Sequence, residues 1–319
     1  MGPRQEPRKE PRQEYARRMH RVQQHIDAHL GDTLELQDLA AVAHFSPFHF
    51  HRVFTAWMGE TLGDYLRRRR LEVAALRLLT QPRTRVLDIA LMVGFGSNEA
   101  FAHAFKLRFG CSASEWRRHK QGERQAQLRK LDQVPGNPDQ DRHAPRSDHP
   151  DLINLEPLMN TLNMNVSVRQ HAPARVAYLR HVGPYGASVA AFWQQRFYPF
   201  MAQHRLLGRP IYGVSHDDPL ITAPEKCRYD TCVAVDDDFV ARGDALITTI
   251  PGGTYAELPF MGTPAEIGPA WSALMRDWLP SSGYQIDGRP TFEYYAPGAL
   301  YEEATGRFQC DIVIPLALL

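Results

Sequence analysis

Apolar residues recur at helical spacing through the first third of the chain. The first 14 residues contain PRQE, PRKE and PRQE, a repeat without an apolar residue to bury, so we expect a disordered tail there. A first helix then fits apolar residues three and four positions apart, namely Tyr15, Met19, Val22, Ile26 and Leu30. The helical pattern continues to about His119, which predicts an all-α domain over residues 15–120.

The pattern changes in the middle of the chain. Residues 121–160 include VPGNPDQDRHAPRSDHP, whose Pro, Gly and mixed charges cannot form a core, and we interpret this segment as a linker. Strand-like runs separated by two helical stretches follow it: VSVRQ, ARVAYLRHV, TCVAV, ALITTI, TYAELPF and DIVIPL. We therefore expect residues 161–319 to form an α+β domain.

The helical part contains an internal repeat. LQDLAAVAHFSPFHFHRVFTAWMGETLGDYL, starting at Leu36, is echoed by VLDIALMVGFGSNEAFAHAFKLRFGCSASEW, starting at Val86. Each copy has a short helix with a small residue, a tight turn and a Ser suited to capping a second helix. Gly94 supplies the turn in the second copy and His44 occupies that place in the first. The pattern predicts two helix-turn-helix units.

The second helix of such a unit enters the major groove of DNA and reads base edges with its outward side chains. In the first copy these outward residues are Phe48, His51, Arg52 and Thr55. In the second copy they are Asn98, Glu99, Ala102, His103 and Lys106. Arg can bond guanine bidentately, and Phe can contact a thymine methyl group. The expected partner is double-stranded DNA.

One long helix separates the two copies. Residues 62–80 would span about 28 Å at 1.5 Å per residue, close to the ~34 Å between successive major-groove faces. Its predicted inward residues are Leu62, Leu66, Val73, Leu76 and Leu79. The run RRRR at 67–70 has two interpretations, phosphate contact or a solvated helix face, and helical twist prevents all four side chains from facing DNA together.

Charge is divided between the two parts of the chain. Residues 1–120 carry 20 Lys and Arg against 13 Asp and Glu, whereas residues 121–319 carry 17 against 23. The basic part favours a polyanionic partner. The chain has a polar N-terminus and lacks an apolar run of about 18 residues, so we expect a cytoplasmic protein without a membrane partner. The scattered cysteines suit a reducing compartment.

Residues 15–120 resemble the DNA-binding domain of the AraC/XylS family of transcription regulators. The resemblance is carried by DIALMVGFGSNEAFAHAFKLRFG, the small-residue turn after it and WRR. It implies a domain of seven helices in two lobes on DNA. His103 and Ala113 depart from the family pattern, which often has a basic residue and a Pro at these places.

The second part of the chain is also duplicated. Trp193 recurs 78 residues later as Trp271, and the Gly-Arg-Pro of 208–210 recurs at 288–290. Each copy follows the order strand, helix, strand, strand. Two such βαββ units are expected to pair about a pseudo-two-fold axis, with a groove between their helices over a shared antiparallel sheet.

Residues 164–319 resemble the GyrI-like effector-binding domains, on GPYG, FEYY after the second Gly-Arg-Pro, and DIVIPL. The resemblance implies a carboxylate in an aromatic pocket, here Glu293. Its counterpart in the first unit is Gly213, so the fold itself does not require a carboxylate at this place. The expected ligand-binding residues are Glu293, Tyr295, Trp193, Trp271, Phe260 and Phe308. The alternative is a solvated edge-strand Glu with the Trp side chains in the core.

These features predict a transcription regulator, an activator by preference, that senses a small apolar effector. A carboxylate among aromatic rings favours a cationic one. Two alternatives stay open: a GyrI-like hydrolase with Glu293 as general base, and a protein-interaction module whose partner is RNA polymerase or another regulator. We expect a monomer or homodimer without metal or cofactor, because His25 and His29 lack a third ligand and nucleotide-binding fingerprints are absent.

Overall fold

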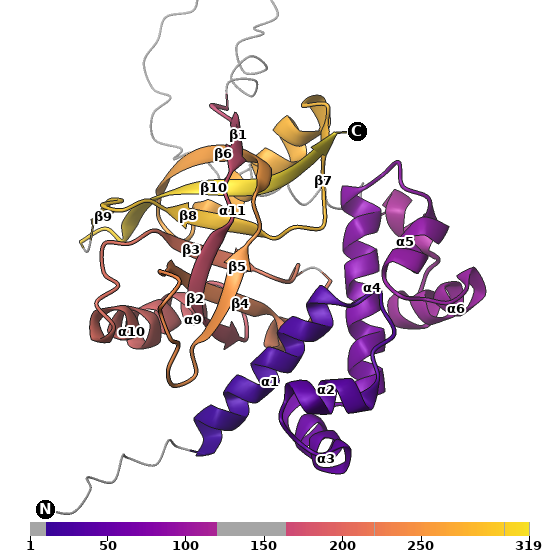
Figure 1. The fold of residues 1–319 in the computed structure, drawn as a ribbon. Coiled ribbons are helices and arrows are strands. Elements are labelled where there is room, and N and C mark those ends of the chain that lie inside the picture. Colours follow the sequence, from indigo (N-terminus) through magenta and orange to yellow (C-terminus); the bar gives the residue numbers. More distant parts are fainter. Residues whose placement is uncertain (1–10, 120–163, 220, 303, 319) are drawn as a thin grey trace, which may run out of the picture.

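The structure, a computed structural model, describes residues 11–119 and 164–318 except 220 and 303. A helical domain lies on one side and a sheet domain on the other (Figure 1). This arrangement confirms the predicted fold class, an all-α double helix-turn-helix domain followed by an α+β domain. The expected linker at 121–160 and residues 1–10 of the expected tail lie outside the described residues.

Helix α1 (Pro11–Ala28) includes the last four residues of the predicted tail, 11–14. The early start has a local cause, because Glu14 forms ion pairs with Arg17 and Arg18 one turn later. Arg18 also donates to the carbonyl of His44 at 3.1 Å, which ties this end of the helix to the first helix-turn-helix unit. The expectation of disorder was therefore wrong for residues 11–14.

The two helix-turn-helix units form as predicted. They consist of α2 (Leu36–Val42) with α3 (Pro47–Met58), and α5 (Val86–Met92) with α6 (Asn98–Phe109). Ser46 and Ser97 cap the second helices, since their side chains accept from the backbone N–H groups three residues later. Helix 113–119 completes seven helices among the described residues, the number that the family resemblance implied.

The turn within each unit needs a left-handed residue. His44 adopts φ 54° and Gly94 adopts φ 87° at equivalent positions of the two copies. Gly94 also has no space for a side chain, because a β-carbon there would lie 2.8 Å from the carbonyl oxygen of Leu30 and 2.8 Å from the Arg70 guanidinium. The second turn is thus restricted to glycine by conformation and by packing.

Helix α4 (Leu62–Thr80) contributes to the cores of both units. Of the predicted inward residues, Leu62 is buried, while Leu66, Val73, Leu76 and Leu79 are half-buried. The buried set is wider and includes Tyr65, Leu71, Ala74, Ala75 and Leu78. All five predicted residues lie in or against these cores, and the buried set is wider because α4 has protein on several sides. None of the described helices is long and apolar enough to span a membrane.

The sheet of the second domain is antiparallel, with the order β1-β6-β10-β8-β3-β4-β2-β5. In chain order, the first five strands are β1 (Ser167–His171), β2 (Ala174–Val182), β3 (Ile211–Ser215), β4 (Arg228–Ala234) and β5 (Leu246–Ile250). The next five strands in chain order are β6 (Gly253–Gly262), β7 (Tyr284–Ile286), β8 (Thr291–Tyr295), β9 (Tyr301–Glu302) and β10 (Arg307–Leu318). Strands β7 and β9 pair with β10 beside the main order.

The strand order reads symmetrically from its centre, as a pseudo-two-fold axis requires. The axis passes between β3 and β8, where Gly213 and Glu293 are direct register partners. The first helical layer is α9 (Ala187–Phe192), η2 (Trp193–Phe197) and α10 (Tyr198–Gln203), and a short turn η3 (Pro224–Lys226) precedes β4. The second is α11 (Ile267–Ala273), η4 (Leu274–Trp278) and η5 (Leu279–Ser281). Both layers cover one face of the sheet over separate cores.

The turn glycine yields a stability prediction. Gly94→Ala should lower the free energy of unfolding by at least about 1–3 kcal/mol, since it adds a strained left-handed alanine and a clash with backbone. The matched substitution His44→Gly removes a left-handed side chain and should change stability by less than about 1 kcal/mol. Urea unfolding measures both. Equal losses for the two variants would contradict this account of the turns.

Candidate DNA-binding face and effector pocket

Helix α3 presents most of its predicted reading residues to solvent. His51 and Arg52 are exposed, and Phe48 is 75% exposed. The Arg52 guanidinium lies 5.8 Å from the centre of the Phe48 ring, so the two side chains form one outward pair. Thr55 differs from the expectation because its hydroxyl oxygen is buried. The last turn of α3 lies against α1, where Gln23 contacts the sulfur of Met58 at 3.6 Å.

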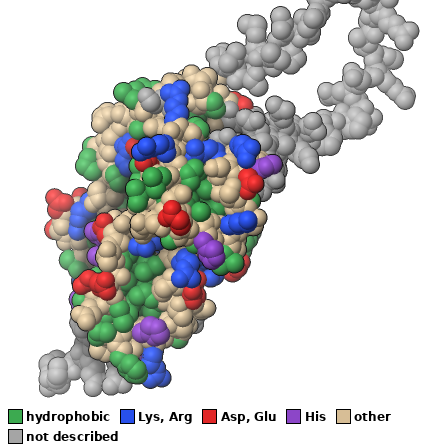
Figure 2. All heavy atoms as spheres, turned by 90° about the vertical axis from the view of Figure 1, so that its right-hand side faces the viewer, with side chains coloured by type: hydrophobic (Ala, Val, Ile, Leu, Met, Phe, Trp, Pro, Cys, Tyr) green, Lys and Arg blue, Asp and Glu red, His purple; other side chains and the backbone are tan. Residues whose placement is uncertain are grey.

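Helix α6 presents its whole predicted set. Phe101 and Phe105 are buried beneath it, as the pattern required. The exposed residues include Asn98, Glu99, Ala102, His103 and Lys106. On the face of the helical domain, basic side chains are interspersed with acidic and hydrophobic ones (Figure 2). The basic side chains on this face are thus spread among others and do not form one continuous patch in this view.

The run of four arginines is neither a phosphate-binding patch nor a solvated face. Arg68 bonds Glu60 and Glu72, and Arg69 bonds Glu72 and Asp217. Arg70 donates to backbone carbonyls of Leu30, Asp32 and Gly94. Arg67, with a side chain 65% exposed, is the member of the run that faces solvent. Three of the four charges are used inside the protein.

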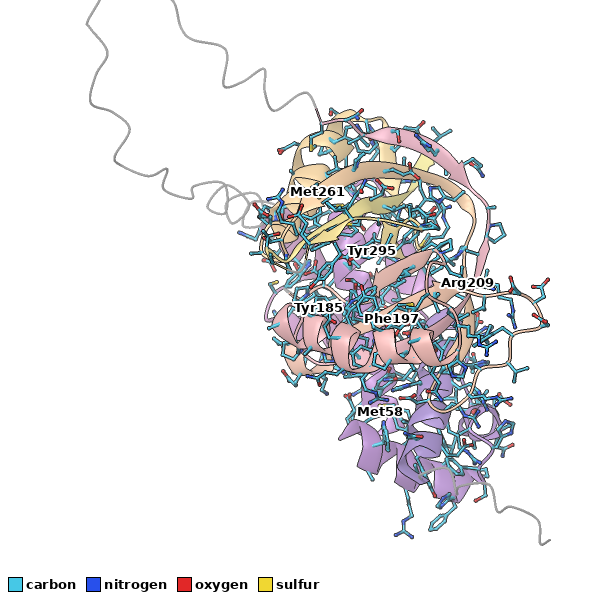
Figure 3. All side chains as sticks on the ribbon, turned by 90° about the vertical axis from the view of Figure 1, so that its left-hand side faces the viewer. Met58, Tyr185, Phe197, Arg209, Met261 and Tyr295 are labelled. Atoms are coloured by element: carbon cyan, nitrogen blue, oxygen red, sulfur yellow. The ribbon has the colours of Figure 1, made fainter. Side chains whose placement is uncertain are left out.

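A pocket of about 730 Å³ lies over the centre of the sheet, between the two helical layers. This volume is within the usual range for sites that bind small molecules. Figure 3 shows Tyr295 on the sheet and Tyr185 near the start of the first helical layer, on which Phe197 lies farther along. The predicted groove between the helices is therefore present.

The carboxylate of Glu293 lies at the pocket floor and holds two tyrosines. One of its oxygens, Oε2, accepts hydrogen bonds from Tyr229 at 2.7 Å and from Tyr295 at 3.1 Å. Gly213 makes the first bond possible, because a β-carbon there would lie 1.9 Å from the Tyr229 hydroxyl. Gly213, the pseudo-two-fold counterpart of Glu293, thus leaves the space in which Tyr229 reaches the Glu293 carboxylate.

Burial raises the pKa of Glu293, and hydrogen bonds from Tyr229, Tyr295 and Trp271 offset this shift in part. Among the described lining residues Glu293 is the one with a charged side chain, so no cation of the pocket wall neutralises it. A carboxylate in this setting is stabilised by a positive charge brought into the pocket. Aromatic faces around it add cation–π attraction.

Most of the predicted ligand-binding residues lie together. Trp193, Trp271, Tyr295 and Phe308 line the pocket with Glu293. Phe260 does not line it, because it packs behind Phe308 with ring centres 5.5 Å apart and belongs to the core under the second helical layer. The alternative of an edge-strand Glu293 is wrong, since β8 lies between β3 and β10.

Sequence reasoning missed several aromatic lining residues, namely Tyr185, Tyr198, Tyr229 and Tyr301. Tyr185 belongs to the GPYG motif, which was the available signal for its position. Tyr229 has no such signal. It reaches Glu293 across β3, so its role depends on the order of strands in the sheet.

Comparison with known proteins agrees with this geometry. A helix-turn-helix domain family matches residues 39–119, and the family described as GyrI-like small molecule binding domain matches residues 164–317. The transcriptional activator AarP of Providencia stuartii is 40% identical over 92 residues, which cover 29% of this chain and 67% of AarP. The chain belongs to the AraC/XylS family of transcription regulators. It joins a DNA-binding domain of this family to a GyrI-like domain.

Two further relatives each match one part of this regulator. The putative transcriptional regulator YosT of Bacillus subtilis, derived from the SPbeta prophage, is 25% identical over 154 residues, 48% of this chain and 99% of YosT. The transcriptional regulator Rob of Salmonella typhimurium is 39% identical over 95 residues, 29% of this chain and 32% of Rob. The chain thus covers about a third of Rob and nearly all of YosT.

The raised pKa of Glu293 predicts the direction of a stability change. A carboxyl group whose pKa is higher in the folded than in the unfolded state destabilises the fold while it is ionised. This destabilisation disappears as the pH falls below the pKa that the group has in the unfolded chain. Glu293→Gln keeps an acceptor for the tyrosines, so it should raise the melting temperature at pH 7.

The gain should shrink towards zero below about pH 4, near the ordinary pKa of a Glu carboxyl group. The exposed Glu225→Gln is the control and should leave stability within about 0.5 kcal/mol of wild type. A melting temperature lowered by Glu293→Gln at pH 7 would refute the assignment of Glu293 as a half-buried acid without a neutralising cation.

Proposed function

We propose that this regulator activates transcription when its GyrI-like domain binds an apolar organic cation. The observation that carries the proposal is the single described charge of the pocket, Glu293, surrounded by tryptophan and tyrosine rings. The volume of about 730 Å³ suits a ligand with several rings. The relative AarP, named as an activator, supports the sign of regulation.

The pocket should bind a cation more tightly than a neutral ligand of the same shape. Tyr229 and Tyr295 both donate to Oε2 of Glu293, and burial still raises the pKa of this carboxyl group. A cation that enters would interact with the same carboxylate and with the ring of Trp193, which lies 5.4 Å from that of Tyr295. A neutral ligand of the same shape gains only apolar burial.

On the DNA side, we propose that α3 and α6 enter successive major grooves. The outward pair of Phe48 and Arg52 would contact a thymine methyl group and a guanine in one groove. His51 would lie beside them. In the other groove the contacts would come from Asn98, Glu99, Ala102, His103 and Lys106. We also propose that the regulator contacts RNA polymerase and that it binds DNA as a monomer or a homodimer.

The volume and the aromatic lining of the pocket support small-molecule binding over a protein-interaction module. The hydrolase alternative has one supporting observation, the raised pKa of Glu293 beside Tyr229, an arrangement that suits a general base. The attached DNA-binding domain favours sensing. Release of product from an ester of a cationic dye, lost in Glu293→Gln, would favour the hydrolase.

The first test uses the cation tetraphenylphosphonium and the neutral triphenylphosphine oxide. Glu293→Gln should weaken binding of the cation by about 1–2 kcal/mol, because it removes a partly desolvated charge, and should change binding of the neutral compound little. Tryptophan fluorescence titration of the full chain measures both affinities. Equal affinity of wild type and variant for the cation would remove the charge from the proposal.

The second test concerns base contact. On a duplex selected by the protein from a random library, Arg52→Ala should cost about 1–3 kcal/mol, and on unselected DNA it should cost less. Thr55→Ala is the matched control, because the Thr55 hydroxyl is buried and should contribute little on either DNA. Fluorescence anisotropy at several salt concentrations measures these affinities. An equal loss on both duplexes would reduce Arg52 to a phosphate contact.

A further inference from the structure

The two domains meet through a buried network of charged side chains, which we call the interdomain network. The helical domain contributes Asp27, Glu60, Arg68, Arg69 and Glu72, and the sheet domain contributes Asp217, Lys226 and Arg228. The four carboxylates match the four cations. Charges taken from water in this way are stabilised only where each has a well-placed partner.

Asp217 is one of the residues through which the two domains are held together. Its carboxylate accepts from the backbone N–H of Arg228 at 2.9 Å and from the Arg228 guanidinium at 2.8 and 3.0 Å. Arg69 of α4 donates to the same carboxylate at 2.5 Å. Arg228 in turn bonds Asp27 of α1. A small displacement of Asp217 and Arg228 would therefore act on α1 and α4 together.

The same pair of residues forms part of the wall behind the effector pocket. Tyr185 lines the pocket, and the single proton of its hydroxyl is shared between the backbone carbonyls of Asp217 at 3.0 Å and Arg228 at 2.9 Å. The hydroxyl also accepts from the backbone N–H of Asp217 at 3.2 Å. Tyr229, the chain neighbour of Arg228, bonds Glu293 and has its ring 6.2 Å from that of Tyr185.

At its other end the network reaches both reading helices. Glu60, which lies two residues beyond the end of α3, bonds Arg68 of α4 and Lys226 of the sheet domain. Arg108, in the last turn of α6, lies 3.7 Å from the carboxylate of Glu72. The relative placement of α3 and α6 is thus linked through α4 to the position of Asp217.

We infer that occupancy of the effector pocket changes DNA affinity through Tyr185, the Asp217–Arg228 pair and Arg69. A cation at Glu293 competes with the hydroxyl of Tyr229 for Oε2. The contact of Tyr229 with Tyr185 and its place beside Arg228 carry this change to the backbone that Tyr185 holds. A shifted Asp217 fits Arg69 differently, and α4 then presents α3 and α6 to DNA at a different spacing. This regulation rests on the proposed function of the pocket.

Tyr185→Phe tests the link, because it keeps the ring in the pocket and removes the hydroxyl that bonds the backbone of Asp217 and Arg228. Affinity for a duplex selected from a random library is measured with and without tetraphenylphosphonium, which gives one ratio. Affinity for the cation with and without the duplex gives the second ratio. In wild type the two ratios must be equal by thermodynamic linkage, and we expect a factor of about 5 or more. In Tyr185→Phe both ratios should fall to about one, whatever the affinity of the free variant for the cation, because each ratio compares the same variant with and without its second ligand.

Tyr198→Phe is the matched control, because it removes a hydroxyl from another tyrosine of the same pocket and should keep the wild-type ratios. Arg69→Lys tests the far side of the link. Lys keeps the charge but has a single ammonium group, whereas Arg69 bonds Asp217 and Glu72 through Nη1 and Asp27 through Nη2, so coupling should fall without loss of affinity for the cation. Melting temperatures confirm that each variant is folded.

The outcomes separate this inference from the function on which it rests. If tetraphenylphosphonium fails to bind wild type, or binds Glu293→Gln equally well, the proposed function and the inference both fail. If the cation binds through Glu293 but the ratios are one in wild type, or persist in Tyr185→Phe, the inference alone is overturned. Loss of coupling in Tyr198→Phe as well would also overturn it, since the effect would then belong to the pocket as a whole.

Discussion

The carboxylate of Asp217 is fully buried and bonded to arginines of both described domains, and it helps to fix how these two domains are placed. Burial alone would raise the pKa of this carboxyl group, but the guanidinium groups of Arg228 and Arg69 hold it well below its usual range. Such a group cannot lose one partner cheaply, because an unpaired charge would be left without water. The domains are thus joined by a contact that tolerates little misplacement.

The pocket depends on a broken symmetry at the centre of the sheet. Duplication places equivalent residues opposite one another between β3 and β8, so Gly213 and Glu293 face each other. One copy supplies the carboxylate and the other supplies the space that lets Tyr229 reach it. A second carboxylate at 213 would repel the first and fill this space. The asymmetry therefore produces a single negative site in a symmetric fold.

The interpretation of the arginine run changed most between sequence and structure. Four consecutive basic residues in a DNA-binding domain suggest phosphate contact or a solvated face. In the folded chain Arg68 and Arg69 join the interdomain network, and Arg70 fixes the loop after α1 and the turn at Gly94. The positive charge that distinguishes residues 1–120 is in part used to attach the acidic second domain.

The sequence by itself determined the helix-turn-helix units, the duplicated βαββ units and the pairing of Glu293 with Tyr295, because these depend on periods of 3.6 and 2 and on nearby caps and turns. Even the left-handed position shared by His44 and Gly94 could be located from the repeat. Tertiary structure alone decided that Tyr229 bonds Glu293, that Phe260 packs behind Phe308, and that Arg69 meets Asp217. These contacts join residues far apart in the chain, and their partners are set by strand order and domain packing, which local periodicity does not encode.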